Sequence, residues 1–380
     1  MTQLSGYDFV AYFETKVPLW LAEKGDPVGL HVGDLSRPVN KIMVTLDVRP
    51  EVVQEAIEKG VDFILAHHPP IYKPLARFDL SNPQTRMYAD LIKHDITVYA
   101  AHTNLDNANG GMNDWLAEAL QLNDVEIMAP SRTKQLKRLN VYVPEEDADA
   151  VRSAITGAGA GQISADYEDC SYSVKGVGRF TPVGNAQPSI GELNKQEMVQ
   201  EERIEVILEE ENVEAVMEAL LASHPYEEPV YEMYSIDQLQ SEKFGLGRVG
   251  ELAKEMTLAE FIPHVKESFD VKGVRVVVPP SKENILIKRV ALCGGDAGKY
   301  YPDAIKQKAD VYITGDVYYH TAHDMQADGL MVVDPGHIIE KICIPKLATL
   351  LAEWKREELW QIDIIESQTN THPFIFDHEI

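Results

Sequence analysis

The first part of the chain alternates short apolar runs with stretches whose apolar residues recur at helical spacing. Residues 40–46, 61–66 and 95–101 are rich in β-branched and aliphatic side chains, and the second run is almost continuously apolar. A continuous apolar run is typical of a strand in a parallel sheet, where both faces are buried. Residues 50–59 have helical spacing and begin with Pro50, which suits a first helical turn. The pattern therefore predicts an α/β fold.

The last part of the chain resumes this alternation. Four strand-like runs occur there, at residues 271–278, 289–292, 309–314 and 330–333. A long amphipathic helix is expected to follow, from about His337 to Trp354. Pro345 lies inside it and removes a backbone donor, so we expect the helix to kink or break near Ile344.

The middle of the chain has a different pattern. VPEEDADAV at 143–151 is echoed by LEEENVEAV at 208–216, and each segment sits between a strand-like run and an amphipathic helix. Such a repeated βα unit indicates two similar halves of one α+β module. We place this module at residues 133–240, inserted between residues 1–132 and 241–380, which together form one α/β domain.

The charge of the chain is strongly acidic. Its 380 residues include 35 basic and 61 acidic side chains, a formal net charge of −26. A field of that sign repels phosphate backbones, so we expect no nucleic acid as a partner. The same field attracts cations.

The cysteines and the apolar runs bear on the compartment. Cys170, Cys293 and Cys343 are far apart and form neither a disulfide framework nor a zinc-thiolate knuckle. The N-terminus lacks the basic and apolar segments of a signal peptide, and no apolar run is long enough to span a membrane. We therefore expect a cytoplasmic protein with reduced thiols.

Histidines and carboxylates directly follow three of the predicted strands. They form three motifs: His67-His68, His102 with Asp106, and His337 with Glu340. Open α/β sheets bind ligands beyond the carboxyl ends of their strands, so these side chains are candidates for one metal site. Ligands of nitrogen and oxygen without sulfur favour zinc, iron or manganese, and a bridging carboxylate would hold two ions about 3.5–4 Å apart. Taken singly, each motif is more often an ordinary loop or first helical turn, and the metal-site interpretation rests on the three motifs together.

Further polar residues follow other predicted strands. Asp47 and Asp296 are interpreted as carboxylates that begin helices. Three more residues, Asp316, His320 and His323, are expected to support the metal ligands or line a pocket. The two histidines are also compatible with ligands on one helix face or with unrelated surface residues. The GxGxxG match at 245–250 lacks a preceding strand pattern and a following βαβ unit, so we reject a dinucleotide site.

Taken together, the motifs AHHPP, HTNLD and DPGHIIEK, with TGDVYYH and NTHPF, resemble the family of GTP cyclohydrolase type-two homologues, also called NGG-one-interacting-factor-three-like proteins. The resemblance implies two related α/β halves around a dinuclear metal centre, with two divalent transition-metal ions per chain and a ring-like homohexamer. The ligands that it implies are His67, His68, Asp106, His337 and Glu340. His102 would lie beside the site.

The inserted module has a resemblance of its own. SHPYEEP at 223–229 looks like the HPYE stretch of divalent-cation-tolerance (CutA-like) proteins, which are relatives of ferredoxin-like PII signalling domains. Two interpretations stay open for this stretch. His224 with Glu227 would form a second metal site, or the segment is a packed turn before the last strand of the module.

Two functions are compatible with these observations. One is a metal-dependent hydrolase of an unidentified small-molecule or nucleotide-like substrate. The alternative is a non-catalytic regulatory or scaffold oligomer that binds metal. The family name implies action on GTP, but no cluster of basic residues fit to hold three phosphates is evident near the motifs.

Overall fold

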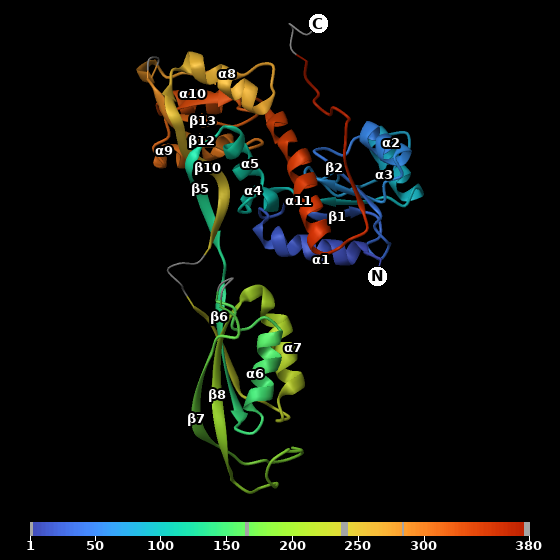
Figure 1. Cartoon of the computed structure of the whole chain (residues 1–380), viewed down its shortest axis with the longest axis vertical. Helices are drawn as coiled ribbons and strands as arrows, with labels where there is room; N and C mark the ends of the chain where they lie inside the picture. The colour runs from blue at the N-terminus through green and yellow to red at the C-terminus, as the bar shows by residue number, and fades with distance from the viewer. Residues whose placement is uncertain (1–2, 164–166, 237–241, 283–284, 376–380) are drawn as a thin grey trace. The chain divides into compact units, whose positions relative to one another are not determined.

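The computed structural model describes residues 3–163, 167–236, 242–282 and 285–375 (Figure 1). The chain divides into two compact units. The larger unit combines residues 1–132 with 244–380, and the inserted unit comprises residues 133–243. No helix among the described residues has both the length and the apolar character that a membrane crossing requires.

The first sheet of the larger unit has, in the described residues, five strands in the order β1-β4-β3-β2-β15. Their bounds are β1 Gly29–Val32, β2 Lys41–Thr45, β3 Phe63–Ala66, β4 Thr97–Ala100 and β15 Asp363–Glu366. All neighbouring strands are parallel except β1, which pairs with β4 in the antiparallel sense. The expected parallel sheet is therefore present, with a short antiparallel strand at one edge.

Both faces of this sheet are covered by helices, which explains why its strands are almost continuously apolar. The covering helices are α1 (Gly6–Lys16) and α11 (Cys343–Glu357) on one face and α2 (Pro50–Glu58) and α3 (Pro83–Lys93) on the other. Successive side chains of β2 alternate between the two layers: Ile42 and Val44 join the core with α1 and α11, while Met43 packs with α2 and α3.

The second sheet of the larger unit has, among the described residues, six strands in the order β11-β14-β13-β12-β10-β5. Their bounds are β5 Asn123–Thr133, β10 Lys243–Met256, β11 Arg275–Val277, β12 Ile287–Leu292, β13 Val311–Ile313 and β14 Met331–Asp334. β12, β13 and β14 are parallel. The GxGxxG match lies inside β10, although its sequence does not have a strand pattern. It pairs with β12 there and opens no phosphate-binding turn.

The remaining helices of the larger unit connect these strands. They are η1 Leu19–Leu21, α4 Thr103–Asn107, α5 Met112–Ala119, α8 Leu258–Phe269, η3 Pro280–Lys282, η4 Gly298–Tyr300, α9 Tyr301–Lys306, α10 Tyr319–Ala327 and η5 His337–Ile342. Asn113 lies inside α5 and is buried, and its amide donates to the Asp106 carbonyl.

The helix expected over 337–354 is two elements. The 3-10 helix η5 covers His337–Ile342, and α11 begins at Cys343. Pro345 therefore lies in the first turn of α11, where a missing backbone donor is tolerated, and causes no kink in a helix interior. The change of helix type occurs just before the proline.

The inserted unit is a four-stranded antiparallel sheet, in the described residues, with two helices. In chain order its elements are β6 Leu136–Pro144, α6 Ala148–Gly157, β7 Ser171–Phe180, β8 Glu197–Glu209, η2 Glu210–Asn212, α7 Val213–Ser223 and β9 Tyr231–Ile236. The strand order is β7-β8-β6-β9. Each repeated segment connects a central strand to a helix, and the two helices close a core separate from those of the larger unit.

Candidate metal centre

The larger unit brings the three strand-end motifs together. His67 and His68 follow β3, and their backbone N–H groups still donate to the carbonyls of Thr45 and Leu46 at the end of β2. His102 precedes the short helix α4, which carries Asp106. The third motif, at residues 337–340, begins η5, which Pro335 and Gly336 connect to β14.

Glu340 lies at the middle of this group. The residue is 2% exposed, and its Oε2 is 3.0 Å from His68 Nε2 and 3.1 Å from His337 Nε2. The same oxygen is 3.8 Å from His67 Nε2, which lies 3.6 Å from Asp106 Oδ1. Three imidazoles and two carboxylates from both sheets therefore converge on one point.

Each of the four histidines is held through its other ring nitrogen. His67 Nδ1 contacts the Ala101 carbonyl at 2.8 Å. The other three contact carboxylates through Nδ1: His68 with Asp47 at 2.7 Å, His102 with Asp26 at 2.8 Å and His337 with Asp316 at 2.8 Å. Hydrogen bonding at Nδ1 sets the tautomer of each ring and leaves Nε2 as the nitrogen that would bind a metal ion.

Two atoms at the centre are buried without a hydrogen-bond partner. They are His67 Nε2 and Asp106 Oδ1. An unpaired buried polar atom is costly, and here the two atoms face each other with lone pairs of the kind that divalent transition metals accept. Three overlapping groups of side chains in the described residues have the spacing to hold an ion: His67 with His68 and His102, His68 with His337 and Glu340, and His67 with Asp106 and Glu340. The residues present thus fit a metal site.

The electrostatics of the cluster are those of a site prepared for positive charge. Burial lowers the pKa of His68, but hydrogen bonds to Asp47 and Glu340 outweigh it and raise that pKa to about 10. For His337, burial is likewise outweighed by Glu340, and the pKa rises to about 9. Burial and the neighbouring Glu340 charge raise the pKa of Asp106 to about 8. The Glu340 pKa is depressed: burial opposes this, but the three surrounding imidazoles prevail.

Glycines allow the second sheet to approach this cluster. A Cβ at Gly294 would lie 2.8 Å from Glu340 Oε1, and one at Gly295 would lie 3.0 Å from the same oxygen. Gly315 passes equally close to the backbone of His337, at 2.8 Å. Side chains at these positions would displace Glu340 or η5, so the glycines are required by close packing around the carboxylate.

Several residues of the site escaped the sequence analysis. Asp47 was expected to begin a helix, but it accepts from His68 and from the hydroxyl of Thr371 near the C-terminus. Asp26 lies in a loop, where it accepts from His102 and Thr103. Its position carried no signal, because no strand or motif precedes it. The position of Asp47 after a predicted strand was a usable signal that we assigned to a helix start.

The residues expected to support the ligands lie in two places. Asp316 supports His337, as described. His320 and His323 lie on α10 and are exposed, with their rings 5.4 and 4.7 Å from the ring of Tyr319. Neither belongs to the metal-capable groups in the described part of the chain.

The histidine of the inserted unit is arranged differently. His224 Nε2 donates to the Tyr142 carbonyl at 3.0 Å, and its Nδ1 accepts from the Tyr226 N–H at 3.0 Å. Burial lowers its pKa. Because both ring nitrogens bind backbone groups, no lone pair remains for a metal, and residues 223–229 form a packed turn between α7 and β9.

Comparisons with known proteins agree over nearly the full length. The model of the Duf34/NIF3 (NGG1p interacting factor 3) family matches residues 4–373. A Bacillus subtilis protein named GTP cyclohydrolase 1 type 2 homolog is 46% identical over 373 residues, which cover 98% of this chain and 99% of that protein. A Listeria innocua protein of the same name is 44% identical over 376 residues, covering 99% of this chain and all of that protein.

Solved structures show the same likeness. A crystal structure of a Bacillus cereus protein described as related to NIF3 superposes with a TM-score of 0.86 at 42% identity, covering 99% of this chain and 100% of that one. A Staphylococcus aureus protein superposes with a TM-score of 0.79 at 31% identity, covering 99% of each chain. The α/β architecture with several sheets is therefore the one found in NIF3-related structures.

Proposed function

The chain belongs to the Duf34/NIF3 family, and from this premise we propose that it is a dinuclear metal-binding protein that acts as a metal-dependent hydrolase on a small-molecule or nucleotide-like substrate. The observation that carries the proposal is the arrangement of Nε2 atoms. Three imidazoles direct Nε2 at the buried Glu340 carboxylate, while oxygen atoms hold Nδ1 of each ring.

The proposed ligands are the five residues that converge on this point: His67, His68, Asp106, His337 and Glu340. Glu340 belongs to two of the metal-capable groups, so it would be the carboxylate shared by two bound ions. His102 belongs to the third and would lie beside the ions. Divalent zinc, iron or manganese would supply Lewis acidity and lower the pKa of a water molecule toward ~7.

The chain's own residues prepare the site for this role. Asp47, Asp26 and Asp316 each hold a ring through Nδ1, so the imidazoles are oriented before an ion arrives. The side chain of His337 is 38% exposed and that of Glu340 is buried, so the site opens to solvent on the His337 side. A substrate would therefore approach past His337 and Asp316.

The charge of the chain restricts the substrate. Lys341 is the basic residue nearest in sequence to the ligands, and its ammonium group binds the Asp270 carboxylate at 2.8 Å. With a formal net charge of −26, the protein disfavours a free polyphosphate. The GTP named for the relatives would thus need metal to neutralise its phosphates, and a less charged substrate suits the site better.

We propose the following architecture, assembly and location for the protein in this function. The two sheets of the larger unit are two related halves around the metal centre. The inserted unit, with its β-α-β-β-α-β order, is a ferredoxin-like domain of the PII/CutA kind. The chain self-associates as a homohexamer and, with its three free cysteines, works in the cytoplasm.

Elemental analysis and turnover assays test this function. Protein purified without chelator should carry up to two transition-metal ions per chain. A screen of phosphoester, nucleotide and cyclic amide substrates should find a turnover that rises with pH toward ~7 and vanishes with chelator. Metal without any metal-dependent turnover would favour the non-catalytic regulatory or scaffold oligomer. Protein without transition metal would contradict both.

A further inference from the structure

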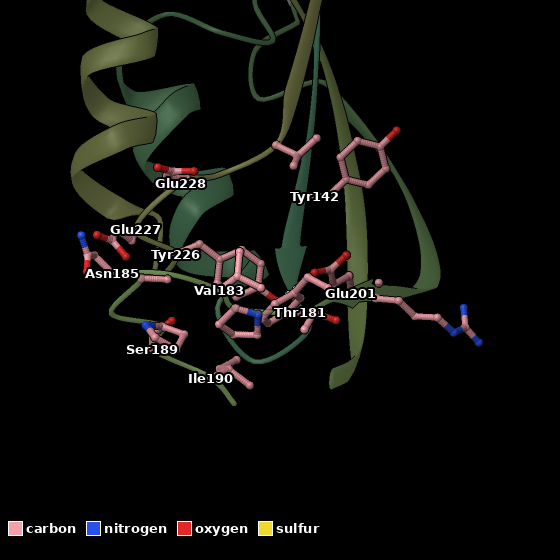
Figure 2. A pocket seen from close by; sticks show the side chains of 17 residues that line it. Tyr142, Thr181, Val183, Asn185, Ser189, Ile190, Glu201, Tyr226, Glu227 and Glu228 are labelled. Atoms are coloured by element: carbon pink, nitrogen blue, oxygen red, sulfur yellow. Dashed lines mark hydrogen bonds between the residues drawn. The ribbon is translucent and has the colours of Figure 1, made fainter. Parts of the chain in front are cut away.

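We propose that the inserted unit contains a second binding site, for a small organic cation with an apolar body. The site is a cavity of about 720 Å³ between the end of β7, the segment that follows it and the turn before β9. Figure 2 shows the lining side chains, with Val183, Tyr226 and Glu201 among those that are labelled. The cavity lies wholly within the inserted unit, whereas every residue of the metal centre belongs to the larger unit.

Glu201 supplies the charged group. Its carboxylate lies directly over Gly178 of β7, because a Cβ on that glycine would be 2.2 Å from Oε2. The Tyr226 hydroxyl donates to Oε1 at 2.8 Å and so orients the carboxylate. In the described part of the chain, no hydrogen bond or ion pair reaches Oε2, and this oxygen is free to accept from a ligand.

The walls around this carboxylate are largely apolar and aromatic. Phe180 and Tyr226 pack edge to face with their ring centroids 5.6 Å apart. The other apolar lining residues are Tyr142, Pro182, Val183, Ala186, Pro188, Ile190 and Val230. Val183 is 62% exposed, so a ligand in the cavity could bury apolar surface of this residue. Aromatic faces next to a carboxylate favour an ammonium or guanidinium group with an attached hydrocarbon body.

The surrounding charge favours the same ligand. Glu227 and Glu228 also line the cavity, against one basic lining residue, Arg179. Residues 133–243 contain nine basic and 22 acidic side chains, a net charge of −13, which is half of the total in less than a third of the chain. The three glutamates form no metal-capable group among the described residues, so the geometry points to an organic cation and not to a metal ion.

Three probes with one body and different head groups test the proposal by isothermal titration calorimetry on the full chain. They are 4-phenylbutylammonium, 4-phenylbutanol and 4-phenylbutyrate. The ammonium compound should bind at least about tenfold more tightly than the other two, and added salt should weaken it. Chelation of metal should leave its affinity unchanged, because the cavity is built without the metal centre.

Two variants locate the binding. Glu201→Gln keeps an acceptor for Tyr226 but removes the charge, and it should weaken the ammonium probe about tenfold. Glu218→Gln removes the same charge from the exposed side of α7, outside the cavity lining, and should leave the affinity unchanged. Equal affinity for the three probes, tighter binding of the carboxylate probe, no binding of any probe, or an unchanged affinity in folded Glu201→Gln would overturn the proposal.

Discussion

Histidine serves different purposes in the two units of this protein. In the larger unit, Nε2 of His67, His68 and His337 faces carboxylates, and Nδ1 of each ring is bound by an oxygen. In the inserted unit, both nitrogens of His224 bind backbone groups. The pKa of His68 is raised to about 10, whereas burial lowers the pKa of His224.

The difference shows which feature distinguishes a histidine that can bind a ligand from one that only stabilises the fold. Both regions place histidine beside proline, and His224 also lies beside glutamates, so neighbours in sequence do not discriminate. What differs is the origin of the partners. His68 meets Glu340, which is 272 residues away, because two strand ends converge. His224 binds the backbone of its own turn and of the adjacent strand β6, and nothing is left for a ligand.

The largest expected effect comes from exchanging one histidine in each unit for alanine. His67→Ala should remove most of the bound metal, because it deletes a ligand that faces both Asp106 and Glu340. His224→Ala should retain metal at the wild-type level. Elemental analysis of both variants, with circular dichroism to verify folding, measures this contrast. Undiminished metal in folded His67→Ala would refute the ligand assignment.

A smaller effect is expected from the residues that hold the rings. Asp47→Asn keeps the shape of the side chain but removes the charge that faces His68 Nδ1. Loss of such a supporting carboxylate typically lowers metal affinity about 10–100-fold. We expect a loss of affinity in that range for Asp47→Asn. Competition with a chromogenic chelator gives the affinity. Asp62→Asn, which changes a carboxylate that binds backbone N–H groups of residues 40 and 41, is the matched control and should leave metal affinity unchanged.

The pH dependence of the inserted unit should reflect its neutral histidine. Because the folded-state pKa of His224 lies below the ordinary 6.5, the unfolded chain takes up the proton first as the pH falls. The stability that neutral His224 contributes is therefore present above pH ~6.5 and is lost below it. Amide hydrogen exchange in β6 and β9 should accelerate between pH 7 and 5, after correction for the intrinsic rate. His224→Gln should lack this extra acceleration, and an identical slope in both proteins would contradict the argument.

The smallest effect is expected from removing the inserted unit. Replacing residues 133–243 by a short Gly/Ser linker should leave metal stoichiometry near wild type, because every proposed ligand lies in the larger unit. The prediction concerns metal stoichiometry alone, and a change in oligomer stability or in substrate access is compatible with it. A deletion protein that folds by circular dichroism and binds no metal would show that the two units are not independent in this respect.

Much of the fold could be predicted because its signals are local. The apolar run that becomes β3 ends at Ala66, and the two histidines follow it directly. The repeat in the inserted unit likewise marked its two strand–helix pairs. The missed features are those that depend on partners distant in sequence. β10 has glycines where a strand prefers branched residues, and it forms because β12 pairs with it.

The buried charge of Arg248 is a second feature that could not be predicted from the sequence. Arg248 is 2% exposed, and its guanidinium binds both oxygens of Asp114 at 2.7 Å together with the carbonyls of Gly245, Gly247 and Ala108. An arginine inside a GxGxxG match gave no sign of this role. Its burial is tolerated only because all these acceptors meet it in the folded chain.

The amino-acid sequence by itself determined β2, β3 and β4 of the first sheet, the family, and the residue types at the ends of these strands, since periodicity and motifs are properties of neighbouring positions. It did not indicate the edge strands β1 and β15. Only the tertiary structure decided how the candidate ligands meet and which carboxylates hold their rings. It placed Glu340 among three imidazoles and brought Asp26 and Asp47 to their rings. It also placed both ring nitrogens of His224 in hydrogen bonds to backbone groups. The physical reason is that a hydrogen bond or a metal site depends on distance in space, and the packing of sheets and loops sets that distance.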